Sequence, residues 1–291
     1  MFRTRLISGI ILVLIAIATI LSGGAVLAAT LLVISLIAYR ELTKACKVGQ
    51  EGKALNALEI TGMAVILLYY VCVYGALSPW CEIDREALYL VVTGFIVFAM
   101  LAFLFVYVFT FPKFKAGQVM AATFAFLYAP VLLSFLYLIR EGFTEGKYLV
   151  WFVFLCSWGS DTCAYAVGIL IGKHKMTPKL SPKKTVEGAV GGIVGAALLL
   201  LLYTHFVINR YTDASLPPAM AAALGVVGAL VSMVGDLAAS AIKRDHEIKD
   251  YGKLIPGHGG IMDRFDSVIM TAPLILGGLL LINELGKLSL L

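Results

Sequence analysis

The chain has 291 residues, of which 60% are hydrophobic and only 14% are charged, and its formal net charge is +5. Soluble domains average about 45–50% apolar and about 25% charged residues, so a chain this apolar does not fit one globule with a water-facing surface. The composition therefore excludes a soluble nucleic-acid-binding protein, a disordered chain and a small secreted domain held by disulfides. It predicts an all-α protein that lies largely in lipid.

Hydrophobic runs recur along the whole chain, and each approaches the roughly 20 residues that a helix needs to cross a bilayer. We therefore predict a polytopic integral membrane bundle of about nine transmembrane helices. A second run follows the first at once, which favours a retained first helix over a cleaved signal peptide. In chain order, the predicted spans are Leu6–Leu21, Gly24–Tyr39, Leu58–Leu77, Ala87–Phe109, Val119–Ile139, Tyr148–Ile171, Thr185–Ile208, Pro218–Ile242 and Arg264–Ile282.

Lysine and arginine are distributed unevenly between alternate connecting segments. With the N-terminus in the cytoplasm, most of the 23 Lys and Arg residues fall in cytoplasmic segments, and the exceptions are Arg85, Arg140, Lys147, Arg210 and Lys287. This bias is typical of cytoplasmic loops in membrane proteins. It predicts a cytoplasmic N-terminus, a C-terminus outside and a multi-pass protein of the cell's inner (cytoplasmic) membrane. Topology and anionic lipid thus explain the basic charge without a nucleic-acid partner.

Unusual polar residues are concentrated in the second half of the chain. We therefore predict that residues 1–147 form structural transmembrane helices, which provide lipid access or dimer contacts, and that residues 148–291 form the catalytic region. Gly188, Gly191, Gly192 and Gly195 have small-xxx-small spacings that suit either helix packing within one chain or a dimer contact. The five cysteines show no metal-binding spacing.

Three acidic residues lie where a charge inside the bilayer is costly. Asp161 and Asp236 are placed roughly 15 Å and 10 Å from the cytoplasmic ends of their predicted helices, at a rise of about 1.5 Å per residue. Glu187 lies just inside the seventh helix. Each alone is compatible with a structural carboxylate bonded to a neighbouring helix. Together they indicate a polar cavity that opens to the cytoplasm.

The connection before the last predicted helix is rich in groups that bind phosphate. Its sequence Pro256-Gly257-His258-Gly259-Gly260 cannot continue a helix, and its glycines allow backbone N–H groups to approach an anion closely. The connection leads into a helix N-terminus, which favours negative charge. Lys243, Arg244 and Lys249 add positive charge beside it. These features predict a nucleotide phosphate site.

Asp263 and Asp266 are three residues apart at the start of the last helix, so they share one face of it. Carboxylate oxygens of this kind suit Mg²⁺, which commonly binds one or two carboxylates together with water and substrate phosphates. A structural role as an N-cap and a first-turn acid is the alternative for this pair.

A second basic segment, residues 173–188, precedes the seventh helix. A run of lysines here is typical of an anchor on the cytoplasmic membrane face. However, Ser181-Pro182-Lys183-Lys184-Thr185 stands directly before a helix start, with Glu187 in its first turn. This arrangement indicates the alternative that the segment grips a lipid phosphate or a nucleotide.

These motifs resemble those of the phosphatidate cytidylyltransferase (CDP-diacylglycerol synthase) family, and the resemblance covers about the second half of the chain. The segments 160–173, 181–188 and 235–236 also resemble that family. The first half agrees only in being helical and apolar. Within residues 240–266, the residues that carry the resemblance are Ser240, Lys243, Arg244, Lys249, Asp250, Gly252, Pro256, His258, Gly259, Gly260, Asp263, Arg264 and Asp266.

The resemblance implies a membrane enzyme that makes CDP-diacylglycerol and pyrophosphate from CTP and phosphatidic acid, as a homodimer and with Mg²⁺ or another divalent cation. It leaves room for a second cation. A phosphatidate oxygen is expected to attack the α-phosphorus of CTP in line. The implied metal ligands are Asp236, Asp263 and Asp266. The implied nucleotide-binding residues are Gly259, Gly260, Lys243 and Arg244. The implied catalytic residues are Asp161, Lys183, Lys184, Glu187, Lys243, Arg244, Lys249, Asp250, His258, Arg264 and Asp266.

Three other functions were weighed against this one. A transporter also places carboxylates within a bundle, but the two halves show no matching broken helices. A CDP-alcohol phosphatidyltransferase uses the same class of lipid, but its acidic motif is absent. A related CTP-dependent enzyme that acts on another membrane phosphate, such as an isoprenoid ether lipid, is the nearest alternative.

Overall fold

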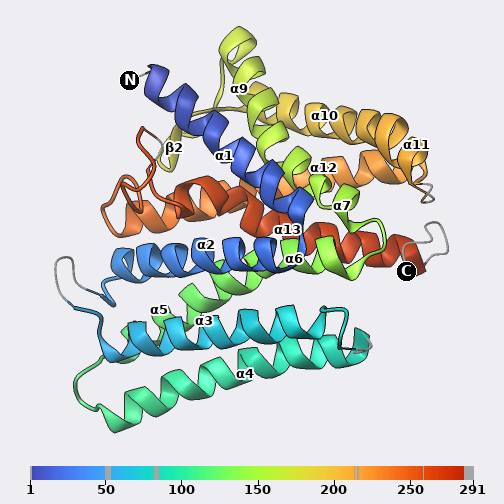
Figure 1. Ribbon diagram of the computed structural model, residues 1–291. Coiled ribbons are helices and arrows are strands. Elements are labelled where there is room, and N and C mark those ends of the chain that lie inside the picture. Colours follow the sequence, from blue (N-terminus) through green and yellow to red (C-terminus); the bar gives the residue numbers. More distant parts are fainter. Residues whose placement is uncertain are drawn as a thin grey trace. The chain divides into compact units, whose positions relative to one another are not determined.

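The computed structural model describes residues 2–49, 54–81, 85–212, 214, 216–257 and 259–284 (Figure 1). The chain divides into two compact units. The first unit contains Met1–Tyr137 and Ile248–Asp263, and the second contains Leu138–Glu247 and Arg264–Leu291. The connection between the last two membrane helices thus packs with the N-terminal helices. The predicted division of function between residues 1–147 and 148–291 stays a prediction.

The prediction of an all-α polytopic membrane protein is confirmed. In the described part of the chain, eight helical segments are long and apolar enough to cross a membrane, and a shorter apolar helix, Ile7–Ser22, precedes them. Each overlaps one predicted span. The orientation of the two termini stays a prediction. The eight segments are Gly24–Ala45, Ala57–Ala76, Ala87–Phe109, Ala116–Gly142, Gly146–Ile171, Val186–Tyr211, Pro218–Asp245 and Met262–Glu284.

The first unit is a set of antiparallel apolar helices in which α3 packs against both α2 and α4 (Figure 1). Gly23 and Gly24 both have positive φ angles, 61° and 46°, and they make the tight turn between α1 and α2. These conformations are strained for residues with a side chain. The helices of this unit are α1 (Phe2–Ser22), α2 (Gly24–Ala45), α3 (Ala57–Ala76), α4 (Arg85–Phe109), α5 (Ala116–Phe126) and the π-helical turn η1 (Leu127–Val131), followed by α6 (Leu132–Gly142), which begins here and ends in the second unit.

A buried polar network braces η1, which contains Pro130. Proline lacks an N–H group and interrupts the helical hydrogen-bond pattern. The Tyr70 hydroxyl donates to the Pro130 carbonyl oxygen at 3.1 Å and bonds the Ser35 hydroxyl at 2.7 Å. The Tyr69 hydroxyl bonds that of Ser134 at 2.7 Å. The two adjacent tyrosines therefore join α3 to α2, η1 and α6.

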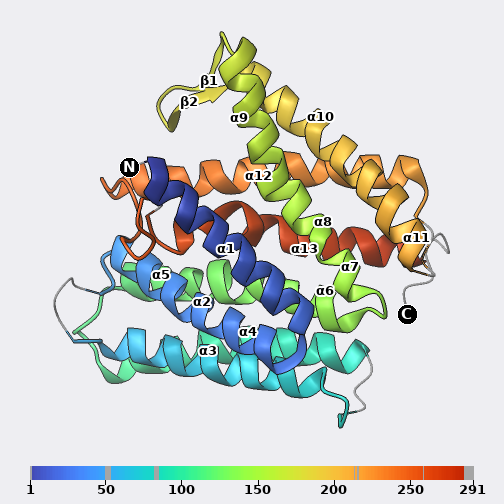
Figure 2. The ribbon, with the colours of Figure 1, turned by 45° about the horizontal axis from the view of Figure 1, so that its top comes forward.

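The second unit consists of four membrane-spanning segments and one β-hairpin. Strands β1 and β2 pair antiparallel between the end of α9 and the start of α10 (Figure 2). Its elements are α7 (Gly146–Leu149), α8 (Trp151–Phe154), the π-helical turn η2 (Leu155–Gly159), α9 (Ser160–Ile171), β1 (Lys175–Thr177), β2 (Ser181–Thr185), α10 (Val186–Tyr203), the π-helical turn η3 (Thr204–Ile208), α11 (Asn209–Tyr211), α12 (Pro218–Asp245) and α13 (Met262–Glu284), whose first residues belong to the first unit.

The glycines of α10 serve packing within the chain. A Cβ atom added at Gly191 would lie 2.5 Å from the Val167 side chain, and one at Gly195 would lie 2.5 Å from the Cys163 side chain. Their absence lets α9 and α10 approach closely, as small residues do in membrane helix pairs. Of the two roles predicted for this stripe, the structure shows packing within one chain.

Candidate active site

Six charged side chains of the second unit form an ionic cluster. Asp236 Oδ2 lies 2.5 Å from Lys184 Nζ. Asp161 interacts electrostatically with Asp236, Lys184 and Arg264, and Asp266 interacts with Asp236, Asp161 and Lys243. The cluster therefore contains three carboxylates and three positively charged side chains, namely Asp161, Asp236, Asp266, Lys184, Lys243 and Arg264. Four elements bring them together: α9, β2, α12 and α13.

The β-hairpin separates two adjacent lysines. Successive side chains of a strand point to opposite sides. On β2, Lys183 is exposed, whereas Lys184 turns inward to Asp236 and keeps a side-chain exposure of 23%. The sequence analysis treated both lysines as candidate phosphate-binding residues and did not distinguish them. Only Lys184 joins the cluster.

The turn η2 places Asp161 directly after a local widening of the helix. Within η2, the Trp158 indole N–H donates to the Arg264 carbonyl oxygen at 3.3 Å, and its ring packs edge-on against Phe265. The span that carries Asp161 is thereby tied to the first turns of α13. Trp158 was not predicted as a site residue, and its only signal was its position three residues before Asp161.

Buried polar atoms in the cluster are incompletely bonded. Asp266 is 7% exposed, and its Oδ1 accepts the Ser267 N–H at 2.8 Å. Among the described residues, the buried Nε of Arg264 and the buried Oγ of Ser232, one turn before Asp236, have no hydrogen-bond partner. An unpaired buried donor costs about 1–3 kcal/mol. Such atoms therefore indicate that a ligand or water completes this site.

The connection of residues 248–261, here called the glycine loop, belongs to the first unit. Gly257 and Gly259 have φ angles of 79° and 87°, as the predicted turn requires. Asp263 Oδ2 accepts the N–H of Tyr251 at 2.8 Å and that of Gly260 at 2.9 Å. Asp263 thus lies in the first turn of α13 and binds the loop backbone, and its predicted role as a metal ligand stays a prediction.

Glu41 is a further acidic residue that bonds this loop, and the sequence analysis did not single it out. It lies on α2, and its two oxygens accept the N–H groups of Ile261 at 3.1 Å and Met262 at 2.8 Å. More than two hundred residues separate these partners along the chain. No local sequence signal marked it.

The remaining predicted residues lie in three places. Lys183, Arg244, Lys249 and Asp250 are exposed. Glu187 accepts the backbone N–H groups of Lys173 and His174 and pairs with the His174 ring, so it closes the base of the β-hairpin. His258 lies outside the described residues. Their roles in catalysis stay predictions.

The carboxylates of the ionic cluster supply only some of the ligands that a divalent cation needs. In the described part of the chain, no group of three or more His, Cys, Asp or Glu side chains is arranged to hold a metal ion by itself. Asp236 and Asp266 nevertheless supply carboxylate oxygens within one cluster. Because Mg²⁺ commonly takes one or two carboxylates and completes its shell with water and phosphate, the residues fit that mode of binding. The metal stays a prediction.

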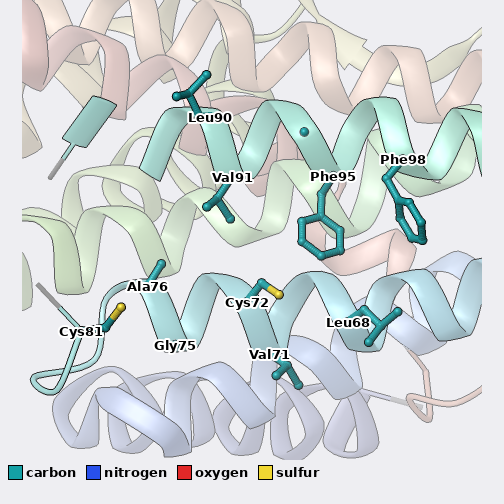
Figure 3. Close-up of a pocket in the computed structure, with 11 residues that line it drawn as sticks. Leu68, Val71, Cys72, Gly75, Ala76, Cys81, Leu90, Val91, Phe95 and Phe98 are labelled. Atoms are coloured by element: carbon teal, nitrogen blue, oxygen red, sulfur yellow. The ribbon is translucent and has the colours of Figure 1, made fainter. Parts of the chain in front are cut away.

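A separate cavity of about 730 Å³ lies between α3 and α4 in the first unit (Figure 3). Its lining is apolar and includes Leu68, Val91, Phe95 and Phe98. Its described lining contains no charged side chain that could bind a phosphate. The ionic cluster, rather than this cavity, is therefore the candidate active site.

A family model described as the cytidylyltransferase family matches residues 3–280. The phosphatidate cytidylyltransferase of Staphylococcus saprophyticus is 30% identical over 275 residues, which are 94% of this chain and 97% of that protein. That of Staphylococcus epidermidis is 31% identical over 275 residues, and that of Staphylococcus aureus is 29% identical over 276 residues, with the same coverage.

The fold and the matches define a membrane-embedded nucleotidyltransferase, which confirms the predicted class of enzyme. The chain belongs to the cytidylyltransferase family.

Proposed function

We propose that this enzyme transfers the cytidylyl group of CTP to phosphatidic acid and forms CDP-diacylglycerol and pyrophosphate. The observation that carries the proposal is the ionic cluster with its unpaired Arg264 Nε, set in membrane-spanning helices. A lipid phosphate and a nucleotide triphosphate meet only where polar groups and the bilayer adjoin. The names of the relatives at about 30% identity support the same pair of substrates.

The cluster supplies cations that interact with acids. Lys184 forms an ion pair with Asp236, and Lys243 and Arg264 interact electrostatically with Asp266 and Asp161. When two polyanionic substrates enter, these cations are expected to turn from the carboxylates to the phosphates. Positioning and charge neutralisation of this kind account for most of the catalysis in phosphoryl transfer. A strong general base is unnecessary, because a phosphate monoester with a second pKa of about 6 is largely ionised near neutral pH.

A divalent cation, Mg²⁺ or a similar ion, completes this proposal. The cluster is balanced in formal charge, so the substrates bring negative charge that its own side chains do not offset. We assign the ion to Asp236 and Asp266, with Asp161 nearby, and leave open a second cation. When bound, the ion supplies Lewis acidity and charge neutralisation at the phosphates. Asp263 contributes to this proposal by binding the backbone of the glycine loop.

The proposal extends to membrane topology and assembly. The segment between α9 and α10 and the segment between α12 and α13 lie on the same side of the membrane, because two spans separate them. Both are rich in lysine, which supports the cytoplasmic side of the inner membrane for the active site. We retain the homodimer as part of the proposal, and a mass measurement of the purified protein in detergent tests it.

The test is an assay of the purified full-length protein in detergent, with the lipid product read by mass. We expect CDP-diacylglycerol and pyrophosphate from CTP, phosphatidic acid and Mg²⁺, and no lipid product when EDTA replaces the metal. A parallel reaction with an isoprenoid ether-lipid phosphate distinguishes the related enzyme, and reactions with ATP, GTP and UTP test the nucleotide. Product from the ether lipid but not from phosphatidic acid would refute the proposed substrate, and full turnover in EDTA would refute the metal.

A further inference from the structure

Glu41 makes an unusual contact for an acidic side chain of a membrane-spanning helix. It is only 8% exposed, and it lies on the part of α2 that packs against the glycine loop. Its carboxylate receives the N–H groups of Ile261 and Met262, at the start of α13. The first N–H groups of a helix have no partner within it, and they favour a negative charge. The two bonds therefore compensate the burial of the charge.

The glycine loop is built around this carboxylate. A Cβ atom added at Gly252 would lie 2.2 Å from Glu41 Oε1, and one added at Gly260 would lie 2.4 Å from the same oxygen. Neither glycine has a φ angle in the left-handed region. Glycine is therefore needed at these positions because a side chain would collide with Glu41. It is not needed for a left-handed backbone conformation. At these two positions the backbone does approach an anion closely, as the sequence predicted. The anion, however, is the carboxylate of the protein's own Glu41.

We propose that Glu41 is a positioning residue for the cytidylyl transfer. It fixes the glycine loop and the first turn of α13, and α13 continues without a break to Arg264 and Asp266. Through this helix, Glu41 orients two members of the ionic cluster without touching a substrate. The inference rests on the proposed function, because it concerns the rate of that reaction.

A purely structural carboxylate would lead to a different result. Loss of a structural contact lowers the fraction of folded protein and leaves the turnover of the folded molecules unchanged. Loss of a positioning contact lowers kcat in protein that is still folded, since displacing a reacting group by about 1 Å costs about 100-fold in rate. The measurement that separates the two is kcat at a temperature where both proteins are folded.

The first test compares Glu41→Gln with Glu59→Gln in the full-length protein. Glu59 is a matched control, because it is also buried in the first unit and accepts the Asn56 N–H at the start of α3. Glutamine keeps one acceptor oxygen but turns its NH₂ group toward the second N–H donor. We expect Glu41→Gln to lower kcat by about 10-fold or more while KM for CTP stays close to that of the wild type. Glu59→Gln is expected to lower only the thermal midpoint.

The second test is a double-mutant cycle between Glu41 and Gly260. The atoms nearest to an added Cβ at Gly260 all belong to Glu41. Gly260→Ala alone is expected to lower kcat, whereas Gly260→Ala in a Glu41→Ala background is expected to add little, because the space is then vacant. Wild-type kcat in Glu41→Gln, an equal kcat loss in Glu59→Gln, or independent effects in the cycle would each overturn the proposal.

Hydrogen exchange of the Ile261 and Met262 amides separates this inference from the proposed function. Glu41→Gln is expected to speed their exchange whether or not the substrates are known. A wild-type protein that makes no CDP-diacylglycerol, but whose amides respond, would refute the proposed reaction and leave the contact intact. Unchanged exchange would refute the anchoring of the loop itself.

Discussion

The acids that bind the glycine loop and the start of α13 are held differently from the acids of the ionic cluster. Glu41 and Asp263 each accept two backbone N–H groups. Asp236 instead pairs with the side chain of Lys184, and Asp266 accepts one backbone N–H, from Ser267, and interacts electrostatically with Lys243. Backbone groups are fixed by the fold, whereas lysine and arginine side chains rotate toward a new anion. This difference supports the proposal that Glu41 and Asp263 preserve a shape and that the cluster acids take part in the chemistry.

The largest effect on activity is expected for Asp266→Asn. The change keeps the volume of the side chain and removes one negative charge from the cluster. We expect turnover to fall by about 100-fold or more, as when one electrostatic group of an active site is removed. Folding should be retained, because a buried carboxylate beside two other acids is costly to the protein. Activity assays together with thermal unfolding in detergent measure both effects, and a folded variant with near wild-type turnover would remove Asp266 from the site.

Asp263→Ala is expected to give the converse result, a large loss of stability. Two buried N–H groups, of Tyr251 and Gly260, would lose their acceptor. At about 1–3 kcal/mol for each unpaired group, the free energy of unfolding should fall by about 2–6 kcal/mol. Titration with a denaturing detergent measures the loss.

The matched variant for this position is Asp263→Asn. Its remaining oxygen is able to accept both N–H groups, so we expect it to recover most of the stability that Asp263→Ala loses. Equal stability of the alanine variant and the wild type would contradict the structural role of Asp263. A stable Asp263→Asn protein without activity would show that its charge is also needed for turnover.

Much of the fold was readable because membrane spans are a property of composition over about 20 residues. The predicted span Pro218–Ile242, for example, is found as α12, Pro218–Asp245. The turns η1, η2 and η3 were not predicted, since a π-helical turn depends on what packs beside it. The β-hairpin was also missed, because its lysines are the residues expected of a charged membrane-face segment.

The candidate site was predictable in its residue types and less so in its contacts. Asp161 and Asp236 stood out, because charge is rare within a bilayer. Asp263 and Asp266 looked equivalent by their spacing, but their surroundings separate them. Asp263 bonds the loop backbone, and Asp266 faces the cluster. The role of Glu41 could not be predicted from the sequence, since its partners lie at the other end of the chain.

A smaller effect is expected for Lys184→Gln, judged against Lys183→Gln on the same strand. Lys184 pairs with Asp236, whereas Lys183 is exposed. We expect the Lys184 variant to lose about 10-fold in kcat/KM for CTP, equivalent to about 1.4 kcal/mol of transition-state stabilisation. The Lys183 variant should stay close to wild type, because an exposed charge contributes little. Equal losses in the two would show that the basic segment acts as a whole rather than through one inward lysine.

The smallest effect is expected for Trp158→Phe, which tests whether η2 itself matters to the cluster. The substitution keeps an aromatic ring against Phe265 but removes the N–H donated to the Arg264 carbonyl oxygen. One neutral hydrogen bond contributes about 0.5–1.5 kcal/mol, so the free energy of unfolding should fall by no more than that. If η2 positions Arg264, kcat falls several-fold while the KM for CTP is unchanged. If the bond only stabilises the fold, Trp158→Phe loses stability alone, and the orientation of the cluster then depends on α13 and its anchor at Glu41 rather than on the π-helical turn.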